Sequence, residues 1–178
     1  TTTALIGHIL KTANHEIAVG GNLGTPVLEF PVLKPNGFYV LELSSYQLEL
    51  TPSLEAAVAV LLNISADHLD RHGGMEGYVA AKKILFERAG EGSQAIIGIE
   101  DNHCRGICLE LMIKRGGKGI VPISASARAP GGVYVDGGML IDDLDNQQNT
   151  IMDLHTVPTL PGQHNWQNAA AAYAAARA

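Results

Sequence analysis

The sequence predicts an α/β fold, with a mostly parallel sheet covered by helices on both faces. Short apolar runs alternate with helical patterns over residues 1–117, as is typical of right-handed βαβ units. One run, AAVAVLLNI at 56–64, is almost wholly apolar, as expected for a strand buried on both faces of a parallel sheet. From residue 118 the pattern changes. Two short runs around Gly137 and Gly138 predict a small antiparallel β-hairpin region within 118–158.

The first half of the chain alternates helical and strand patterns. Apolar residues at helical spacing predict a helix over 1–14, and EIAVG at 16–20 predicts a short strand. The aromatic and β-branched residues of 38–43 predict a second strand, which the apolar run at 56–64 follows. An amphipathic pattern over 74–90, closed by a glycine, predicts the next helix.

The second half begins in the same way and then changes. SQAIIGIE at 93–100 predicts a strand, and a helix should begin after Asp101 and stop at Gly116 and Gly117. Beyond the hairpin, NTIMDLHTV at 149–157 predicts a further strand, and an alanine-rich helix runs to the last residue. Neither terminal helix shows a cap in the sequence. We therefore expect an internal domain of a longer protein, truncated at both ends.

Composition excludes several classes of protein. Hydrophobic residues make up 46% and charged residues 17% of the sequence, which is typical of a soluble globular protein. The net charge of −6 argues against a nucleic-acid-binding surface, because such a surface needs a basic patch. No apolar run approaches the roughly 18 residues of a membrane span, and no signal peptide is recognisable. Cys104 and Cys108 fit reduced core thiols of a cytoplasmic protein.

Polar residues cluster where the predicted elements meet. Glu42 and the SSYQ after it end one strand, and NISADHLDR at 63–71 ends the next. GGNLGTP at 20–26 follows the first strand, and GQHNWQN at 162–168 begins the last helix. Ligands bind at the carboxyl ends of the strands in an open parallel sheet, so we expect these clusters to converge on one edge.

Glu42 stands between Leu41 and Leu43 in an apolar strand. A buried carboxylate is costly unless it is paired or bound to a metal, and this position therefore favours a functional role. A structural salt bridge to Arg71 or to a lysine is the alternative.

Two other pairs have both a functional and a structural interpretation. Asp67 and His68 offer two metal ligands, although Asp67 could simply cap the helical turn that follows. Asn165 and Asn168 are three residues apart and share a face of the last helix. Asn165 could alternatively be only an N-cap.

Lys82 and Lys83 differ in their predicted surroundings. Lys82 lies four residues after Tyr78 and four before Phe86, so helical spacing puts it along the buried face, whereas Lys83 lies toward the outside. Burial disfavours the ammonium form and leaves a neutral amine available for chemistry or covalent modification. Alternatively, the charged head of Lys82 reaches water while its stem is buried.

Taken together, the clusters resemble a known family. The chain is similar to the central ATP-binding domain of the Mur ligases, which has a P-loop NTPase-like fold. The motifs that carry this resemblance occur in the family's order and span nearly the whole chain, except for 91–158: TTTALIGHIL, GGNLGTP, LELSSYQLE, LLNISADHLDRHGGMEGYVAAKKILF and LPGQHNWQNAAAA. The pairing of ELSSYQLE with GNLGTP most resembles the member that adds glutamate.

GGNLGTP is glycine-rich like a phosphate-binding loop, but it is too short to be one. In the family, the phosphate loop has the pattern G-T-N-G-K-S/T and directly precedes a helix like TTTALIG. Thr1 would therefore be at most the last residue of that loop and would lie at the ATP. GGNLGTP would instead face the UDP-linked substrate. Residues 1–178 would be the central domain, without the UDP-binding N-terminal domain and the C-terminal domain.

The resemblance also implies a reaction. ATP would phosphorylate the carboxylate of UDP-N-acetylmuramoyl-L-alanine, and the amine of D-glutamate would displace the phosphate, with two Mg²⁺ ions assisting. Glu42, His68 and Lys82 would be the catalytic and metal-binding residues, with Lys82 carbamylated. The remaining implied contacts are with adenine (Asn165, Asn168) and with the muramoyl-alanine part (Asn22, Ser44, Gln47).

Two kinds of alternative stay open. The parent could be another Mur ligase or a folylpolyglutamate synthase, or the chain could be a non-catalytic α/β binding module. Without a phosphate loop and flanking domains, the chain by itself is expected to be inactive.

Overall fold

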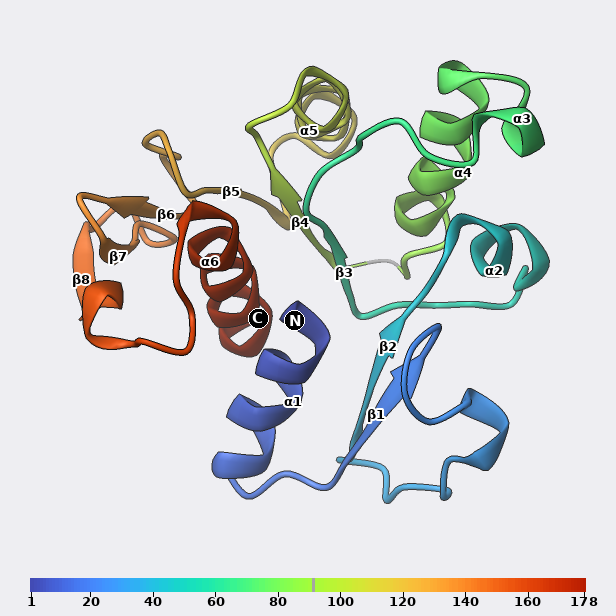
Figure 1. Ribbon diagram of the computed structural model, residues 1–178, viewed down its shortest axis with the longest axis horizontal. Coiled ribbons are helices and arrows are strands. Elements are labelled where there is room, and N and C mark those ends of the chain that lie inside the picture. The colour runs from blue at the N-terminus through green and yellow to red at the C-terminus, as the bar shows by residue number, and fades with distance from the viewer. Residues whose placement is uncertain (91) are drawn as a thin grey trace.

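The strands form two sheets with a groove between them. The computed structural model describes residues 1–90 and 92–178, and in these residues a two-stranded and a six-stranded sheet are formed (Figure 1). The smaller sheet pairs β1 (Ile17–Gly21) in parallel with β2 (Phe38–Glu42). The helix α1 (Thr2–Thr12) precedes β1 and packs against it. The predicted mostly parallel sheet is thus confirmed, but in two parts.

The larger sheet has strand order β3-β4-β5-β6-β7-β8. Neighbouring strands are parallel from β3 to β6 and antiparallel from β6 to β8. Its strands are the following: β3 (Val58–Leu61), β4 (Gln94–Gly98), β5 (Ile120–Ser124), β6 (Val133–Asp136), β7 (Met139–Asp142) and β8 (Asn149–Asp153). The hairpin around Gly137 and Gly138 and the strand after it are therefore confirmed.

The strand β5 is one element that the sequence pattern did not reveal. It is wholly buried and lies parallel between β4 and β6. Pro122 sits within it, and a proline normally argues against a central strand because it has no N–H to donate. Because of Pro122, the sequence pattern did not predict this strand, although the structure contains it.

Helices cover both faces of the larger sheet. On one face, α4 (Met75–Glu87) and α5 (Asn102–Arg115) pack against it, and on the other α6 (Gln163–Arg177) does so (Figure 1). Alternate residues of β4 point to opposite faces, so that Ala95 and Ile97 meet α4 and α5 while Ile96 meets α6. The alanines of α6 let it approach the sheet closely.

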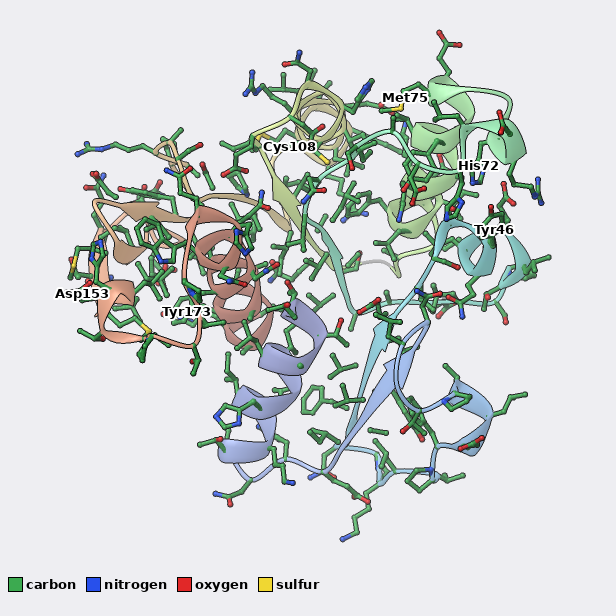
Figure 2. The ribbon with its side chains drawn as sticks, in the orientation of Figure 1. Tyr46, His72, Met75, Cys108, Asp153 and Tyr173 are labelled. Carbon is green, nitrogen blue, oxygen red and sulfur yellow. The ribbon has the colours of Figure 1, made fainter. Side chains whose placement is uncertain are left out.

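Local signals set the ends of α5 as predicted. The Asp101 side chain accepts a hydrogen bond from the backbone N–H of Cys104, and Gly116 takes the left-handed conformation beyond the last turn. Cys104 and Cys108 are buried on its inner face, as expected, and Figure 2 shows Cys108 on α5. Burial is the main reason that the pKa of each thiol is raised.

Short helices fill the connections. They are η1 (Val27–Glu29), α2 (Ser45–Leu50), α3 (Leu69–His72) and η2 (Leu154–Thr156). None of the helices in the described residues has both the length and the apolar character that crossing a membrane requires.

The groove lies between β2 and β3, which are edge strands of the two sheets. It has a volume of about 1200 Å³ and is lined by residues of both strands. In the described residues neither strand has a hydrogen-bonded neighbour on the groove side. The groove therefore exposes backbone donors and acceptors of two strand edges to solvent.

Candidate active site

Polar side chains gather in the groove beside its apolar walls. They come from the first turn of α1, the carboxyl ends of β2 and β3, the helix α4 and the second turn of α6. The polar lining residues from these elements include Thr1, Thr2, Thr3, Glu42, Asn63, Lys82 and Asn168. Of the four clusters expected to converge, three contribute a side chain to the groove, namely Glu42, Asn63 and Asn168, whereas no residue of 20–26 lines it. The predicted residues outside its lining are Asn22, Ser44, Gln47, His68 and Asn165.

Glu42 ends β2 and is partly buried. Its carboxylate accepts a hydrogen bond from the Thr3 hydroxyl at 3.4 Å, and its backbone carbonyl accepts one from the Asn22 N–H at 2.7 Å. A Cβ on Gly21 would lie 2.4 Å from that carbonyl oxygen, so the close approach of β1 here needs glycine. The alternative of a Glu42–Arg71 salt bridge is wrong, because Arg71 pairs with Glu49 at 3.2 Å.

Lys82 lines the same groove from α4. Burial lowers the pKa of its amine, while the nearby charges of Asp67, Cys104 and Glu42 act in the opposite direction. The amine lies 5.5 Å from the ring centroid of Tyr78, over its face. The balance favours a neutral amine more than in an ordinary lysine, in agreement with the interpretation from helical spacing.

Lys83 does not simply point outward. Its ammonium lies 2.6 Å and 2.7 Å from the two carboxylate oxygens of Glu110 on α5, and its side chain is 27% exposed. This ion pair joins α4 to α5 and keeps Lys83 away from the groove-lining residues. The two adjacent lysines therefore have separate surroundings.

His68, the third residue expected at the metal site, is not among the residues that line the groove with Glu42 and Lys82. It is the residue before α3 and adopts a left-handed backbone with φ of 50°. Its imidazole lies 3.4 Å from the Asp67 carboxylate and 5.2 Å, centroid to centroid, from the Tyr46 ring. Asp67 therefore contacts His68, and no side-chain cap of α3 is formed.

The first two turns of α6 contain both predicted asparagines. Gly162 is the N-cap of α6, so Asn165 is not the cap, and its amide donates to the carbonyl of Pro161 at 2.7 Å. Asn168 accepts a hydrogen bond from the Thr2 hydroxyl at 2.8 Å and donates one to the Asn165 side chain at 3.3 Å. This contact joins the first turn of α1 to the second turn of α6.

The residues expected to face a substrate have local roles as well. Ser44 and Gln47 form a capping box at the start of α2, in which each side chain bonds the other residue's backbone N–H. Asn22 is exposed in the loop after β1. The capping box holds the Ser44 and Gln47 side chains in one arrangement.

The sequence interpretation missed a buried histidine, His72. Its side chain is only 1% exposed, with its Nε2 atom 3.0 Å from the Ser45 hydroxyl and its Nδ1 atom 3.5 Å from the Glu49 carboxylate. Tyr46 and Tyr78 pack on it, with ring centroids at 5.6 Å and 5.4 Å, and Figure 2 shows Tyr46 beside His72. The four-residue spacing of Ser45 and Glu49, which puts both on one face of α2, was the available signal.

The cluster around His72 contacts His68 through the Tyr46 ring, which packs on both histidines. It ties α2, which follows Glu42, to α3, which follows His68. The access of a substrate to Ser45 is blocked because the serine is 2% exposed, so the serine, histidine and glutamate form a structural network.

Comparison with protein families and known proteins gives a consistent result. Residues 1–176 match the family model described as the Mur ligase middle domain. The chain is 54% identical over 177 residues to UDP-N-acetylmuramoylalanine–D-glutamate ligase of Rhodospirillum rubrum, covering 99% of this chain and 37% of that protein. It is 52% identical over 178 residues to the ligase of the same name from Caulobacter vibrioides (strain NA1000 / CB15N), covering 100% and 38%. The chain thus spans less than two fifths of these curated relatives.

Solved structures support the fold. UDP-N-acetylmuramoyl-L-alanyl-D-glutamate–2,6-diaminopimelate ligase superposes with a TM-score of 0.73 at 22% identity, over 99% of this chain and 40% of that one. UDP-N-acetylmuramoylalanyl-D-glutamyl-2,6-diaminopimelate–D-alanyl-D-alanyl ligase from Acinetobacter baumannii has a TM-score of 0.65 at 20% identity, over 99% and 39%.

Proposed function

Since the chain belongs to the Mur ligase family, whose middle domain it carries, we propose that it is the central part of an ATP-dependent, D-glutamate-adding ligase of peptidoglycan synthesis. Its proposed acceptor substrate is UDP-N-acetylmuramoyl-L-alanine, in keeping with the names of the relatives at 50–54% identity. The observation that carries the proposal is that Glu42 and Lys82 line one groove with the first turn of α1 and with Asn168 of α6.

The proposed reaction has two steps. A carboxylate oxygen of the acceptor attacks the γ-phosphorus of ATP, ADP leaves, and an acyl phosphate forms. The amine of D-glutamate then attacks the acyl carbon, a C–N bond forms, and phosphate leaves as the amine gives up a proton. Positioning and electrostatic stabilisation carry most of the catalysis in phosphoryl transfer, so the chain's task is to hold charged groups in place.

The N-terminal ends of α1 and α6 are assigned to ATP. The N-terminus of α1 has unpaired backbone N–H groups and the positive end of the helix dipole, which suit phosphate next to Thr1. Asn165 and Asn168 would contact the adenine. The hydrogen bond between Thr2 and Asn168 supports this assignment, because it holds the two helix ends together.

Glu42, His68 and carbamylated Lys82 are assigned to Mg²⁺, with two ions expected. Among the described residues, no three His, Cys, Asp or Glu side chains are grouped to hold a metal ion. Carbamylation would supply an additional metal ligand, because it would turn the Lys82 amine into an anionic oxygen ligand in the groove that Glu42 also lines. Bound Mg²⁺ would neutralise the negative charge of the phosphates and of the substrate carboxylate.

Asn22, Ser44 and Gln47 are assigned to the muramoyl-alanine part of the acceptor. Ser44 and Gln47 are already held by the capping box, which lowers the entropic cost of ordering them on binding. Asn22 follows β1 at the same end of the small sheet.

The flanking parts of the ligase are proposed to complete the site. A UDP-binding N-terminal domain and a C-terminal domain would flank residues 1–178, and the segment before Thr1 would carry the phosphate loop. The open edges of β2 and β3 support this arrangement, since a strand leading into α1 could pair with both. The chain by itself would then be inactive.

The full-length protein allows a direct test. We expect ATP-dependent incorporation of D-glutamate into UDP-N-acetylmuramoyl-L-alanine, and Lys82→Ala should lower the rate on the order of 100-fold or more, because a charge-stabilising group is lost. Lys83→Ala is the matched control and should keep most of the activity, since Lys83 pairs with Glu110 outside the groove. Incorporation of a different amino acid, or equal loss in both variants, would contradict the proposal.

A further inference from the structure

The side chain of Gln167 bridges two neighbouring strands of the larger sheet. It is 8% exposed, and its Nε2 atom donates to the carbonyl of Leu62 at 3.2 Å and to the carboxylate of Glu100 at 2.6 Å. Leu62 follows β3 and Glu100 follows β4. A single amide of α6 therefore connects the helix to the carboxyl ends of both strands.

A glycine makes room for this amide. A Cβ on Gly98, the last residue of β4, would lie 2.8 Å from the Gln167 Nε2 atom and 1.9 Å from the Leu62 carbonyl oxygen. Real side chains do not tolerate such distances. The notch that receives Gln167 thus exists only because residue 98 has no side chain.

Glu100 is itself held on its other oxygen. Its Oε1 atom accepts hydrogen bonds from the Ser124 hydroxyl at 2.9 Å and from the backbone N–H of Ala125 at 2.5 Å. Ser124 is fully buried at the end of β5. The carboxylate therefore links the carboxyl ends of β4 and β5 to α6, and Gln167 extends the link to β3. The charge of Glu100 strengthens its own hydrogen bonds.

The turn of α6 that contains Gln167 also contains Asn165 and Asn168. Asn168 is the next residue and faces Thr2 of α1, while Gln167 faces the sheet. Because adjacent helical residues point in different directions, one side chain can anchor the turn while its neighbour faces the groove. A shift of Gln167 would move both asparagines with it.

We propose that Gln167 is a positioning residue, which acts with Glu100 to set the turn formed by residues 165–168 so that Asn165 and Asn168 meet the base of the nucleotide. This inference rests on the proposed function, since it assumes that ATP occupies the groove. Gln167 would not touch ATP. It would act through the backbone of its own turn and would affect the base end of the nucleotide more than the phosphate end.

The test compares two ligands in the full-length protein. Calorimetry would measure the dissociation constants of a non-hydrolysable ATP analogue and of inorganic tripolyphosphate, each with Mg²⁺. Gln167→Ala should weaken the analogue about 10-fold, the scale of one lost hydrogen bond to a charged group, and leave tripolyphosphate within about twofold. Gln148→Ala is the matched control, because Gln148 is exposed in the connection between β7 and β8, away from every residue assigned to ATP; it should change neither constant.

A double-mutant cycle tests the partnership with Glu100. If the two side chains act as a unit, Glu100→Ala should weaken the analogue to a similar extent, and the double variant should be little weaker than either single variant. Additive losses would overturn the pairing.

The outcomes separate this inference from the function on which it rests. An unmodified protein that does not bind the analogue would contradict the ATP site itself. Binding by the unmodified protein and equal binding by Gln167→Ala would overturn only the positioning role. Equal losses for the analogue and for tripolyphosphate, with a lowered melting temperature, would show that Gln167 merely stabilises the fold.

Discussion

Lys82 and Lys83 show how much one position along a helix changes the chemistry of a side chain. Lys82 lines the groove, and burial lowers the pKa of its amine. Lys83 holds Glu110 on the next helix. Helical spacing predicted the burial of Lys82, because Tyr78 and Phe86 lie one turn away on either side. It could not predict the partner of Lys83, which comes from a separate helix.

The lowered pKa of Lys82 makes a testable prediction. Its amine loses its proton at a lower pH than an ordinary lysine, so a larger neutral fraction is present at any pH below that of ordinary lysine titration. In trace acetylation of the folded protein followed by mass spectrometry, the labelling of Lys82 should reach half its maximum at a lower pH than that of a lysine in a short unstructured peptide. A midpoint at or above that of the peptide lysine would contradict the interpretation.

Arg71 illustrates the limit of pairing charges by sequence. The sequence offered it as a partner of Glu42, yet it bonds Glu49, together with His72. Glu42 is the last residue of β2, whereas Glu49 lies near the end of α2, and the fold brings the guanidinium to the second of these carboxylates. Glu42, which does not pair with Arg71, lies in the groove and accepts a hydrogen bond from the Thr3 hydroxyl.

At the scale of elements, Gly98 and Gly106 differ in the space available for a side chain, so the same substitution at each should have opposite effects on stability. A Cβ on Gly98 would meet the Leu62 carbonyl and the Gln167 amide, whereas a Cβ on Gly106, in the exposed middle of α5, would meet nothing within 4 Å. Gly98→Ala should therefore destabilise the protein by about 1–3 kcal/mol through overpacking. Gly106→Ala should stabilise it by about 0.5–1 kcal/mol, because alanine favours the helix.

Urea unfolding of the full-length protein checks both glycine variants. The midpoint should fall for Gly98→Ala and rise for Gly106→Ala. If Gly98→Ala unfolded at the same urea concentration as the unmodified protein, the close contact of β3, β4 and α6 would not have the importance assigned to it.

Elements with local signals were predictable, and those without were not. The helix α5 has an acidic cap and a left-handed glycine, and the β6–β7 hairpin has its pair of glycines, so short-range chemistry defines them. The strand β5 contains Pro122, which argues against a strand. The residues that pair with it belong to β4 and β6, and no pattern within β5 itself shows this pairing. Its burial between two strands outweighs the missing N–H.

At the scale of the whole molecule, the groove between the two sheets connects the segments that supply Glu42, Lys82 and Asn168. Both β2 and β3 present an open edge to it. If a strand from the segment before Thr1 fills it, backbone N–H groups on these edges become hydrogen-bonded. Hydrogen–deuterium exchange should then be slower in β2 and β3 of the full-length protein than in the chain of residues 1–178.

The strand β4 is the internal control for this exchange experiment, because it already has neighbours on both sides and should be protected in both proteins. The chain of residues 1–178 should also release no phosphate from ATP in the presence of the acceptor and D-glutamate. Equally fast exchange of β2 and β3 in both proteins would exclude a strand in the groove.

The sequence by itself determined the α/β class, the order of most helices and strands, the family, and the residue types expected at the strand ends. These follow from patterns within a few residues, such as apolar spacing, caps and glycine turns, which are set by the chain's own neighbours. Only the tertiary structure decided the division into two sheets and the contacts between distant segments. Thr2 bonds Asn168 across 166 positions, and Gln167 bonds Glu100 across 67, because packing of helices on the sheet brings these side chains within hydrogen-bond distance and no local pattern records it.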